Sequence, residues 1–135
     1  MHILVDTCIW SIALRTNKII HKQFIQELKE LILDHRAHLI GPIKQELLSG
    51  ITEKKQFIEL RERLSVFSSL DIISTDYEVA AEFFNHCRVK GIQGSMINFL
   101  ICAVAHRYEM PIFTNDNDFI YFKKILPIRL HQISD

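Results

Sequence analysis

A chain of 135 residues is long enough for one domain with a buried core, and 48% hydrophobic with 24% charged residues is typical of globular proteins. The 16 basic and 16 acidic side chains cancel, which excludes attraction of nucleic acid by overall charge and leaves only a local patch. Three widely spaced cysteines without a CxxC pair argue against a zinc site or a disulfide framework. We therefore expect a single cytoplasmic domain over residues 1–135, without a leader or a membrane span.

The first half of the chain alternates short apolar runs with amphipathic segments. Residues 2–6 (HILVD) predict a buried strand that ends in an acid and leads into a helix. An apolar stripe over residues 18–36 predicts a helix, and residues 38–42 (HLIGP) predict a second strand. Proline suits the first turn of the next helix, which ends near Gly50, and an amphipathic helix follows over residues 53–66.

The second half continues the alternation, beginning with a predicted strand over residues 70–74 (LDIIS). The remaining expected elements are a helix from Asp76 to about Lys90, an apolar helix from about Ser95 to Tyr108, a strand over 110–114, a short helix over 118–124 and a last strand around 128–131. Strands that alternate with helices predict an α/β fold, in which helices flank both faces of a mainly parallel sheet.

Acidic residues follow two of the predicted strands. Asp6 ends the first strand, and Asp116 comes after the strand at 110–114. Open α/β sheets bind ligands at the carboxyl ends of their strands, although each acid alone would also suit a helix cap or a turn. Glu46 lies three residues after apolar Ile43 on a predicted helix, so it either turns partly inward or is a solvent-facing charge. A fourth acid, Asp118, follows Asp116 by two residues.

Several carboxylates at one edge of a sheet predict a cation site. Like charges at close range disfavour ionisation unless a cation compensates, and hard oxygen ligands suit Mg²⁺ or Mn²⁺. The sequence contains no histidine spacing that supports zinc, no phosphate-binding glycine motif and no nucleophile elbow. Carboxylates are therefore the chemistry that this chain offers.

A carboxamide interrupts the apolar helix GSMINFLICAVA (94–105). Asn98 lies one turn before Cys102 and two turns before Ala105, so it shares their face, which we expect to be buried. Ser95 is a good N-cap residue, and Asn98 would then also satisfy the backbone of the first helical turn.

Three stretches resemble, in order and spacing, the PIN-domain ribonucleases, specifically the VapC-like toxins of VapBC-type toxin–antitoxin pairs: LVDTCIWSIALR, PIKQELLSG and IFTNDNDF. The resemblance covers nearly the whole chain and implies a three-layer sandwich with a central, mainly parallel sheet. It implies that the following residues form the site: Asp6, Glu46 and Asp116 as catalytic acids, Thr7 and Thr114 as supporting residues, and Asp118 as an outer metal ligand or only a helix cap.

In that family an aspartate normally stands where this chain has Asn98. The carboxamide keeps an oxygen that can coordinate a metal or its water but loses the negative charge, so we expect weaker Mg²⁺ binding and reduced activity. Two explanations remain open: a natural member with reduced or altered activity, or a deliberately disarmed form of a toxic ribonuclease. The near-isosteric change from Asp to Asn favours the second.

The resemblance implies an Mg²⁺- or Mn²⁺-dependent endoribonuclease that hydrolyses RNA phosphodiesters with a metal-activated water. It also implies a transfer or ribosomal RNA target, a homodimer and a VapB-like antitoxin whose tail crosses the site. Single strands or loops are the expected substrates, because duplexes hide their base edges. Closeness in sequence to the acidic motifs suggests four RNA-contacting residues: Arg15, Lys44, Arg88 and Lys90.

Other functions remain open. Asn98 favours a catalytically silent PIN-like module that binds an antitoxin in a repressor complex, whereas intact Asp6, Glu46 and Asp116 weigh against it. A metal-dependent DNA nuclease is the second alternative, but the chain is small and shows no helical-arch insertion. A nucleotide-binding or phosphoacceptor domain is a third, and it would need a phosphate loop or paired N-terminal acids that this chain lacks.

Overall fold

A computed structural model describes residues 1–14 and 21–133 of the chain. In chain order its elements are β1 (Ile3–Val5), α1 (Thr7–Leu14), α2 (Lys22–Leu33), β2 (Ala37–Ile40), α3 (Gly41–Leu48), α4 (Lys54–Leu64), β3 (Ser68–Leu70), α5 (Ser74–Val89), α6 (Met96–Tyr108), β4 (Ile112–Phe113) and α7 (Asp118–Lys123). None of these helices is both long and apolar enough to cross a membrane.

The four strands form one sheet in the order β3-β2-β1-β4, and all three strand pairs are parallel. The chain first builds outward from β1 to β2 and β3, and then returns to place β4 on the other side of β1. Strand order therefore reverses between β1 and β4. In open α/β sheets the crevice beyond the carboxyl ends of the strands at such a reversal is where ligands bind.

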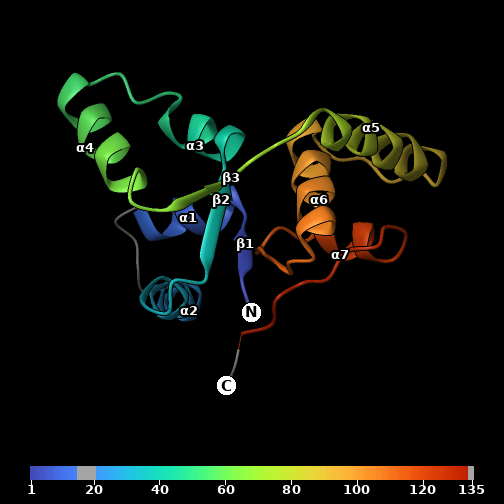
Figure 1. Cartoon of the computed structure of the whole chain (residues 1–135), viewed down its shortest axis with the longest axis horizontal. Coiled ribbons are helices and arrows are strands. Elements are labelled where there is room, and N and C mark those ends of the chain that lie inside the picture. Colours follow the sequence, from blue (N-terminus) through green and yellow to red (C-terminus); the bar gives the residue numbers. More distant parts are fainter. Residues whose placement is uncertain (15–20, 134–135) are drawn as a thin grey trace.

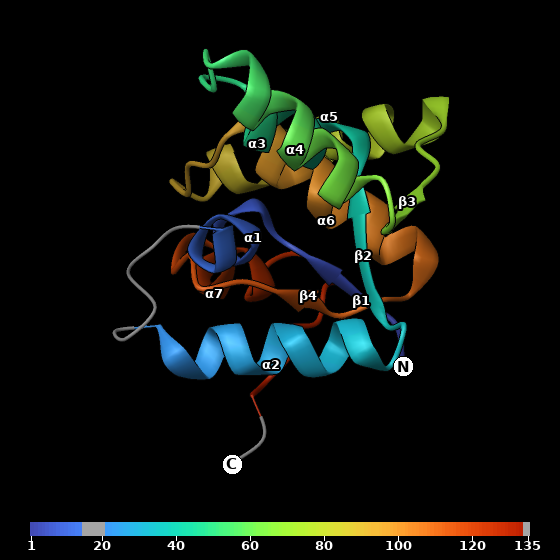
Figure 2. The ribbon, with the colours of Figure 1, turned by 90° about the vertical axis from the view of Figure 1, so that its left-hand side faces the viewer.

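Helices cover both faces of this sheet. Helices α1 to α4 lie on one side, and α5, α6 and α7 lie on the other (Figure 1). The view turned by 90° shows the same division, with α1 to α4 nearer the viewer and α5 to α7 behind the strands (Figure 2). The predicted fold class, an α/β sandwich of the PIN type with a parallel sheet between helical layers, is confirmed.

The core centres on β1 and α6. Ile3, Leu4 and Val5 are completely buried, as a central parallel strand covered on both faces requires. Helix α6 is buried over seven consecutive residues, 99–105, because it lies between the sheet and α5. Its hydrophobic sequence and its cap at Ser95, whose side chain accepts from the Asn98 N–H, agree with the predicted apolar helix.

Two predicted strands are wrong in place or extent. The strand expected at residues 70–74 is β3, which ends at Leu70, and α5 begins at Ser74 instead of Asp76. The Asp76 carboxylate accepts a hydrogen bond from the Ile73 N–H (2.9 Å), which commits this apolar stretch to a helix start. The strand expected around 128–131 is reduced to a single bridge between Ile112 and Leu130.

The helix predicted over residues 18–36 is described only from Lys22 to Leu33, and residues 15–20 lie outside the described part. The strand predicted over 110–114 is shorter, at Ile112–Phe113. The helices expected over 53–66 and 118–124 are present as α4 and α7. Strand ends are lost most easily because a short parallel strand has few ladder hydrogen bonds to define it.

Candidate active site

Asp6 lies at the carboxyl end of β1, where strand order reverses. Its carboxylate is only 4% exposed and accepts hydrogen bonds from the Thr7 N–H to Oδ1 (2.7 Å) and from the Thr114 hydroxyl to Oδ2 (2.8 Å). Thr114 directly follows β4, so this second bond joins the ends of two neighbouring strands. The predicted convergence of the first and last motifs is therefore present in the fold.

Glu46 reaches the same edge of the sheet from α3, the helix that follows β2. Helix α3 begins at Gly41, directly after β2, with Pro42 in its first turn, and carries Glu46 toward α1. The Thr7 hydroxyl donates to Glu46 Oε1 (2.6 Å), although 39 residues separate the two in sequence. Glu46 is solvent-exposed at the site, so both interpretations of its position were partly right.

Asp116 lies in the turn after β4, and backbone hydrogen bonds fix its position. Its N–H donates to the Thr114 hydroxyl (3.0 Å), and its Oδ1 accepts from the Asp118 N–H (2.9 Å). Asp118 is the first residue of α7 and is exposed. This geometry ties Asp118 to the site through its backbone, as a helix-start residue, while its carboxylate remains available to solvent.

The electrostatics of Asp6 are those of an uncompensated buried acid. Burial raises the pKa of Asp6 above its ordinary value, and the negative charge of Asp116 raises it further. Hydrogen bonds from Thr114, Cys8 and Thr7 oppose this rise without cancelling it. A bound cation would relieve the repulsion between the two carboxylates.

Cys8 also belongs to the site, and sequence reasoning did not identify it. Its Sγ lies 3.3 Å from Asp6 Oδ2 and 3.4 Å from Thr114 Oγ1, and it accepts from the Asn115 N–H (3.4 Å). Burial, with the charge of Asp6 added, raises the pKa of Cys8 to about 11, so the thiol is neutral at pH 7. It braces the carboxylate against the loop after β4. Its place two residues after Asp6 was the only available signal.

Asn98 lies in the first turn of α6, half-buried, with its N–H bonded to the Ser95 hydroxyl (3.1 Å). One turn later, Cys102 is fully buried, and its pKa is raised mainly by burial and in part by the negative charge of Asp6. The charge of Asp6 therefore reaches the part of α6 that carries Cys102.

The donor set fits a hard divalent cation in kind. Carboxylate and hydroxyl oxygens meet at this edge, and hard oxygen ligands are what Mg²⁺ and Mn²⁺ prefer. Among residues 1–14 and 21–133, however, no three His, Cys, Asp or Glu side chains gather closely enough to hold an ion.

Comparison with protein families identifies the architecture. A model of the PIN domain matches residues 3–125, most of the chain. The chain belongs to the PIN domain family. Members of this family are generally nucleases that typically use a divalent metal. No match was found among curated protein sequences.

Solved structures share the fold of this PIN domain at low sequence identity. FitAcB from Neisseria gonorrhoeae is 20% identical, with a TM-score of 0.76 and 96% of each chain covered. VapBC2 from Rickettsia felis, bound to a DNA fragment from its promoter, is 20% identical, with a TM-score of 0.76 and 97% of this chain and 98% of that one covered. DNA-bound VapBC from Salmonella typhimurium is 18% identical, with a TM-score of 0.70 and 99% of each chain covered.

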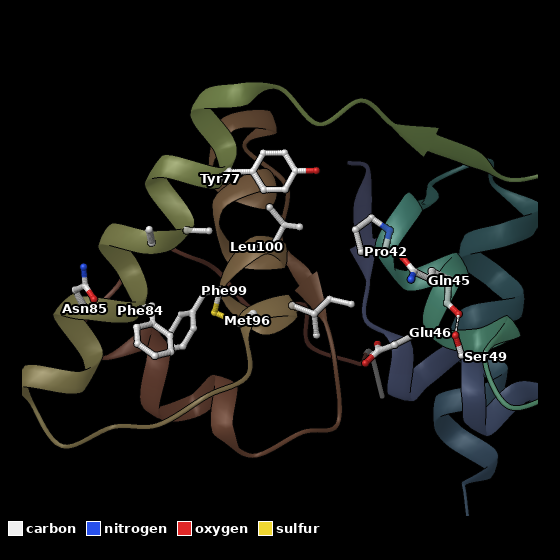
Figure 3. A pocket seen from close by; sticks show the side chains of 13 residues that line it. Pro42, Gln45, Glu46, Ser49, Tyr77, Phe84, Asn85, Met96, Phe99 and Leu100 are labelled. Atoms are coloured by element: carbon white, nitrogen blue, oxygen red, sulfur yellow. Dashed lines mark hydrogen bonds between the residues drawn. The ribbon is translucent and has the colours of Figure 1, made fainter.

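Two cavities adjoin Glu46 in this PIN domain. The first, of about 630 Å³, lies between α3 on one side and α5 and α6 on the other; Figure 3 shows Glu46 at one wall and Tyr77, Phe84 and Leu100 across from it. Most of its lining side chains are apolar. The second, of about 640 Å³, lies between α1, α3 and α4; seven of the twelve described residues that line it have polar side chains, and polar and apolar atoms share its surface about equally. Glu46 and Ser49 line both cavities.

Three of the four basic residues that the sequence suggested for RNA contact lie in the described part of the PIN domain. Lys44 lines a shallow hollow with Phe57, Arg88 lines another with Gln93, and Lys90 is the exposed C-cap of α5. None of these three lines a cavity that contains Glu46. Arg15 lies outside the described residues.

Proposed function

We propose that this PIN domain is a metal-dependent endoribonuclease of the VapC-like toxin class, with activity reduced by Asn98. The observation that carries the proposal is the hydrogen-bonded set at the strand-order reversal, where Thr7 links Asp6 to Glu46 and Thr114 links Asp6 to the loop of Asp116. The family, and the toxin–antitoxin complexes among proteins of the same fold, support this assignment.

In this proposal Asp6 and Asp116 hold Mg²⁺ or Mn²⁺, with an oxygen of Asn98 in place of a carboxylate and Asp118 as an outer ligand. The bound cation supplies charge stabilisation to the phosphodiester and activates the attacking water. The chain's own groups then position the reaction. Thr114, together with Cys8, fixes the Asp6 carboxylate, and the Thr7 hydroxyl occupies Glu46 Oε1, which leaves Oε2 to accept a proton from water.

The substrate in this proposal is a single-stranded or looped segment of transfer or ribosomal RNA. A site on an open edge accepts a splayed strand, whereas a duplex would present mainly its backbone. The chain has no net charge, so local groups beside the site must hold the RNA. A cytoplasmic location is part of the proposal, and the three free thiols agree with a reducing compartment.

Two protein partners are proposed. The apolar cavity between α3 and α5–α6, bordered by exposed Tyr77 and Met96, is proposed as the contact face of a homodimer, since homodimer interfaces are enriched in such residues. A VapB-like antitoxin is proposed to inhibit the site by bringing a basic side chain to Asp6, Glu46 and Asp116. Light scattering on Tyr77→Asp, compared with the unchanged chain, tests the first partner: loss of dimer mass is expected.

One alternative function has an observation in its favour. The described part of the chain gathers no three acidic, histidine or cysteine ligands, and Asn98 removes one acid that α6 would supply. A catalytically silent module that only binds an antitoxin is consistent with this. Titration calorimetry with Mn²⁺ separates the two: no binding, even after Asn98→Asp, would favour the silent module.

The deciding experiment is Mg²⁺-dependent cleavage of a small-RNA pool by this chain and by its Asn98→Asp variant, side by side. We expect the variant to cut and EDTA to stop it, whereas the chain with Asn98 cuts weakly or not at all. A DNA oligonucleotide of matched sequence serves as the control for nucleic-acid type. If neither protein cuts RNA, the nuclease function is wrong and the silent module is favoured; if both cut equally, the assigned role of position 98 is wrong.

A further inference from the structure

We propose that the polar cavity enclosed by α1, α3 and α4 is a nucleotide subsite, which binds one unpaired base beside the scissile bond and favours a base with an exocyclic amino group. This inference rests on the proposed function. It assigns substrate specificity to a pocket that the sequence motifs did not indicate. The residues of this pocket are also different from the basic residues that the sequence suggested for RNA contact.

The cavity opens directly on the acidic site. Thr7 and Glu46, which are hydrogen-bonded to each other, form part of its wall, so an occupant would lie against the reacting groups. Its volume of about 640 Å³ lies within the range of roughly 300–1,000 Å³ that is typical of small-ligand sites. A phosphodiester held at Asp6 would therefore place a neighbouring nucleotide within reach of this space.

One face of α4 supplies the groups that would recognise a nucleotide. Gln56, Glu59 and Arg63 follow each other at spacings of three and four residues, so they share a face of the helix, and all three line the cavity. Buried Leu60, which also lines the cavity, and buried Leu64 anchor α4 to the core beside these polar residues. The recognition groups are thus carried by a helix rather than by a mobile loop.

Arg63 is suited to contact a backbone phosphate. Among the described residues that line this cavity it is the cationic one, and it is exposed near the end of α4. Glu59 is one turn away, yet among the described residues Arg63 forms no ion pair within 4.0 Å. Its guanidinium therefore remains available for a bidentate contact to phosphate oxygens.

Glu59 determines the expected base preference. A carboxylate only accepts hydrogen bonds, so it is satisfied by an amino group and repelled by a carbonyl oxygen. Adenine, cytosine and guanine present an amino group on their base-pairing edge, whereas uracil presents two carbonyl oxygens and a single ring N–H there. Gln56, which both donates and accepts, can complete either pattern, and Leu14, Leu47 and Ile51 add apolar surface for the base plane.

The contrast with the other cavity favours RNA over protein as the occupant. The cavity between α3 and α5–α6 is lined mainly by apolar side chains, as a protein interface core would be. The cavity between α1 and α4 instead presents three hydroxyls, a carboxamide, two carboxylates and a guanidinium. Polar groups that both donate and accept are what reading an unpaired base requires.

The test uses fluorescence anisotropy of labelled ten-nucleotide RNAs, all-A, all-C and all-U, with the chain that carries Asn98 in Mg²⁺, and a gel to show that the RNA stays intact. We expect all-A and all-C to bind at least about fivefold more tightly than all-U, the lower end for a good base contact. Arg63→Gln should weaken all three by about fivefold or more and reduce the salt slope by about one.

Two further variants make the test specific. Arg61→Gln removes the same charge from the same helix at a residue that does not line the cavity, and it should leave the affinities nearly unchanged. Glu59→Gln should abolish the preference for all-A and all-C without weakening all-U. Equal losses of RNA affinity in Arg61→Gln and Arg63→Gln would show that only the overall positive charge matters, and this would overturn the proposal.

The nucleotide subsite and the nuclease function can be disproved separately. If Asn98→Asp cuts RNA and the added Arg63→Gln change alters neither rate nor base preference, the subsite is wrong while the nuclease function stands. If Asn98→Asp does not cut, the nuclease function is wrong, and the binding preferences still decide the subsite. If Arg63→Gln leaves the RNA affinity unchanged but alters the molecular mass measured by light scattering, the cavity is a protein interface and the proposal is overturned.

Discussion

Asp6 and Asp76 are almost equally buried, at 4% and 2% exposure, but their environments are opposite. Asp76 is paired with Arg107, whose Nε and Nη2 reach its two oxygens at 2.8 Å each. Asp6 is held by Thr7, Cys8 and Thr114, which are neutral, and it lies close to the like charge of Asp116.

The two carboxyl groups consequently shift in opposite directions. Burial is the largest influence on each and raises the pKa of both. At Asp76 the hydrogen bonds from Arg107 and Ile73, with the Arg107 charge, outweigh burial and lower the pKa. At Asp6 the neutral donors do not outweigh it, and the pKa stays raised. A buried acid that the fold supplies with its own cation is structural, whereas one left without a cation is suited to bind one.

The pairing of Asp76 also has a clear structural purpose. Arg107 Nη2 donates to the Asp71 carbonyl oxygen (2.7 Å), and the Tyr108 hydroxyl donates to the same oxygen (3.1 Å). These bonds fasten the segment between β3 and α5 to the end of α6. The helix pair behind the site is thereby fixed before any ligand arrives.

The largest expected effect separates the two acids by activity. In the Asn98→Asp background, Asp6→Ala should lower RNA cleavage by more than about 100-fold, since even outer partners of metal ligands contribute 10–100-fold. Its circular dichroism spectrum should match that of the parent. Asp76→Asn in the same background should keep cleavage at a temperature well below its melting point. Comparable cleavage by both variants would contradict the distinction.

The next effect separates them by stability. Asp76→Asn should lower the free energy of unfolding by about 1.5–3 kcal/mol, the range for hydrogen bonds to charged groups, because Arg107 loses its charged partner. Urea denaturation followed by circular dichroism measures this loss. Asp71→Asn serves as the control, because the interaction there uses the backbone carbonyl, and it should change stability little. An unchanged free energy of unfolding in Asp76→Asn would mean that the ion pair contributes nothing measurable to stability.

Acid titration should reveal the Asp76 pair directly. The folded pKa of Asp76 lies below the ordinary 3.8, so its contribution to stability is complete above about pH 4 and is lost as pH falls through the folded value. The difference in unfolding free energy between the parent and Asp76→Asn should therefore shrink as pH falls below 4. A constant difference across this range would rule out the ion pair as its source.

The smallest expected effect concerns Asp6 in metal-free buffer. Asp6→Asn should raise the free energy of unfolding by up to about 1 kcal/mol at pH 7, because a neutral group of the same shape avoids the cost of a buried charge beside Asp116. Thermal melts in EDTA measure the change. Adding Mg²⁺ should raise the melting temperature of the parent more than that of Asp6→Asn. A destabilised Asp6→Asn would show that its hydrogen bonds matter more than its charge.

Sequence reasoning worked best where a feature depends on residues close in the chain. The Ser95 cap, the apolar run of α6 and the alternation of strands with helices are local patterns, and each is present. The strand predicted at 70–74 was wrong because the Ile73 N–H bonds to the Asp76 carboxylate, which Arg107 holds from 31 residues away, and α5 therefore begins at Ser74. Asp6 and Asp116 could be selected because each follows a predicted strand, and Glu46 because it lies three residues after apolar Ile43 on a predicted helix.

The sequence by itself determined which atoms can act: carboxylates after two strands, a third acid on α3 and an amide at position 98. Only the tertiary structure decided which of these meet. The contacts of Thr114 with Asp6 and of Thr7 with Glu46 span 108 and 39 residues, and no periodicity records such distances. The bracing thiol of Cys8 and the α4 face of Gln56, Glu59 and Arg63 emerged only when parallel pairing placed β4 beside β1 and packing brought α4 beside α1. The physical reason is that pairing and packing act between segments distant in sequence, whereas patterns report only neighbours.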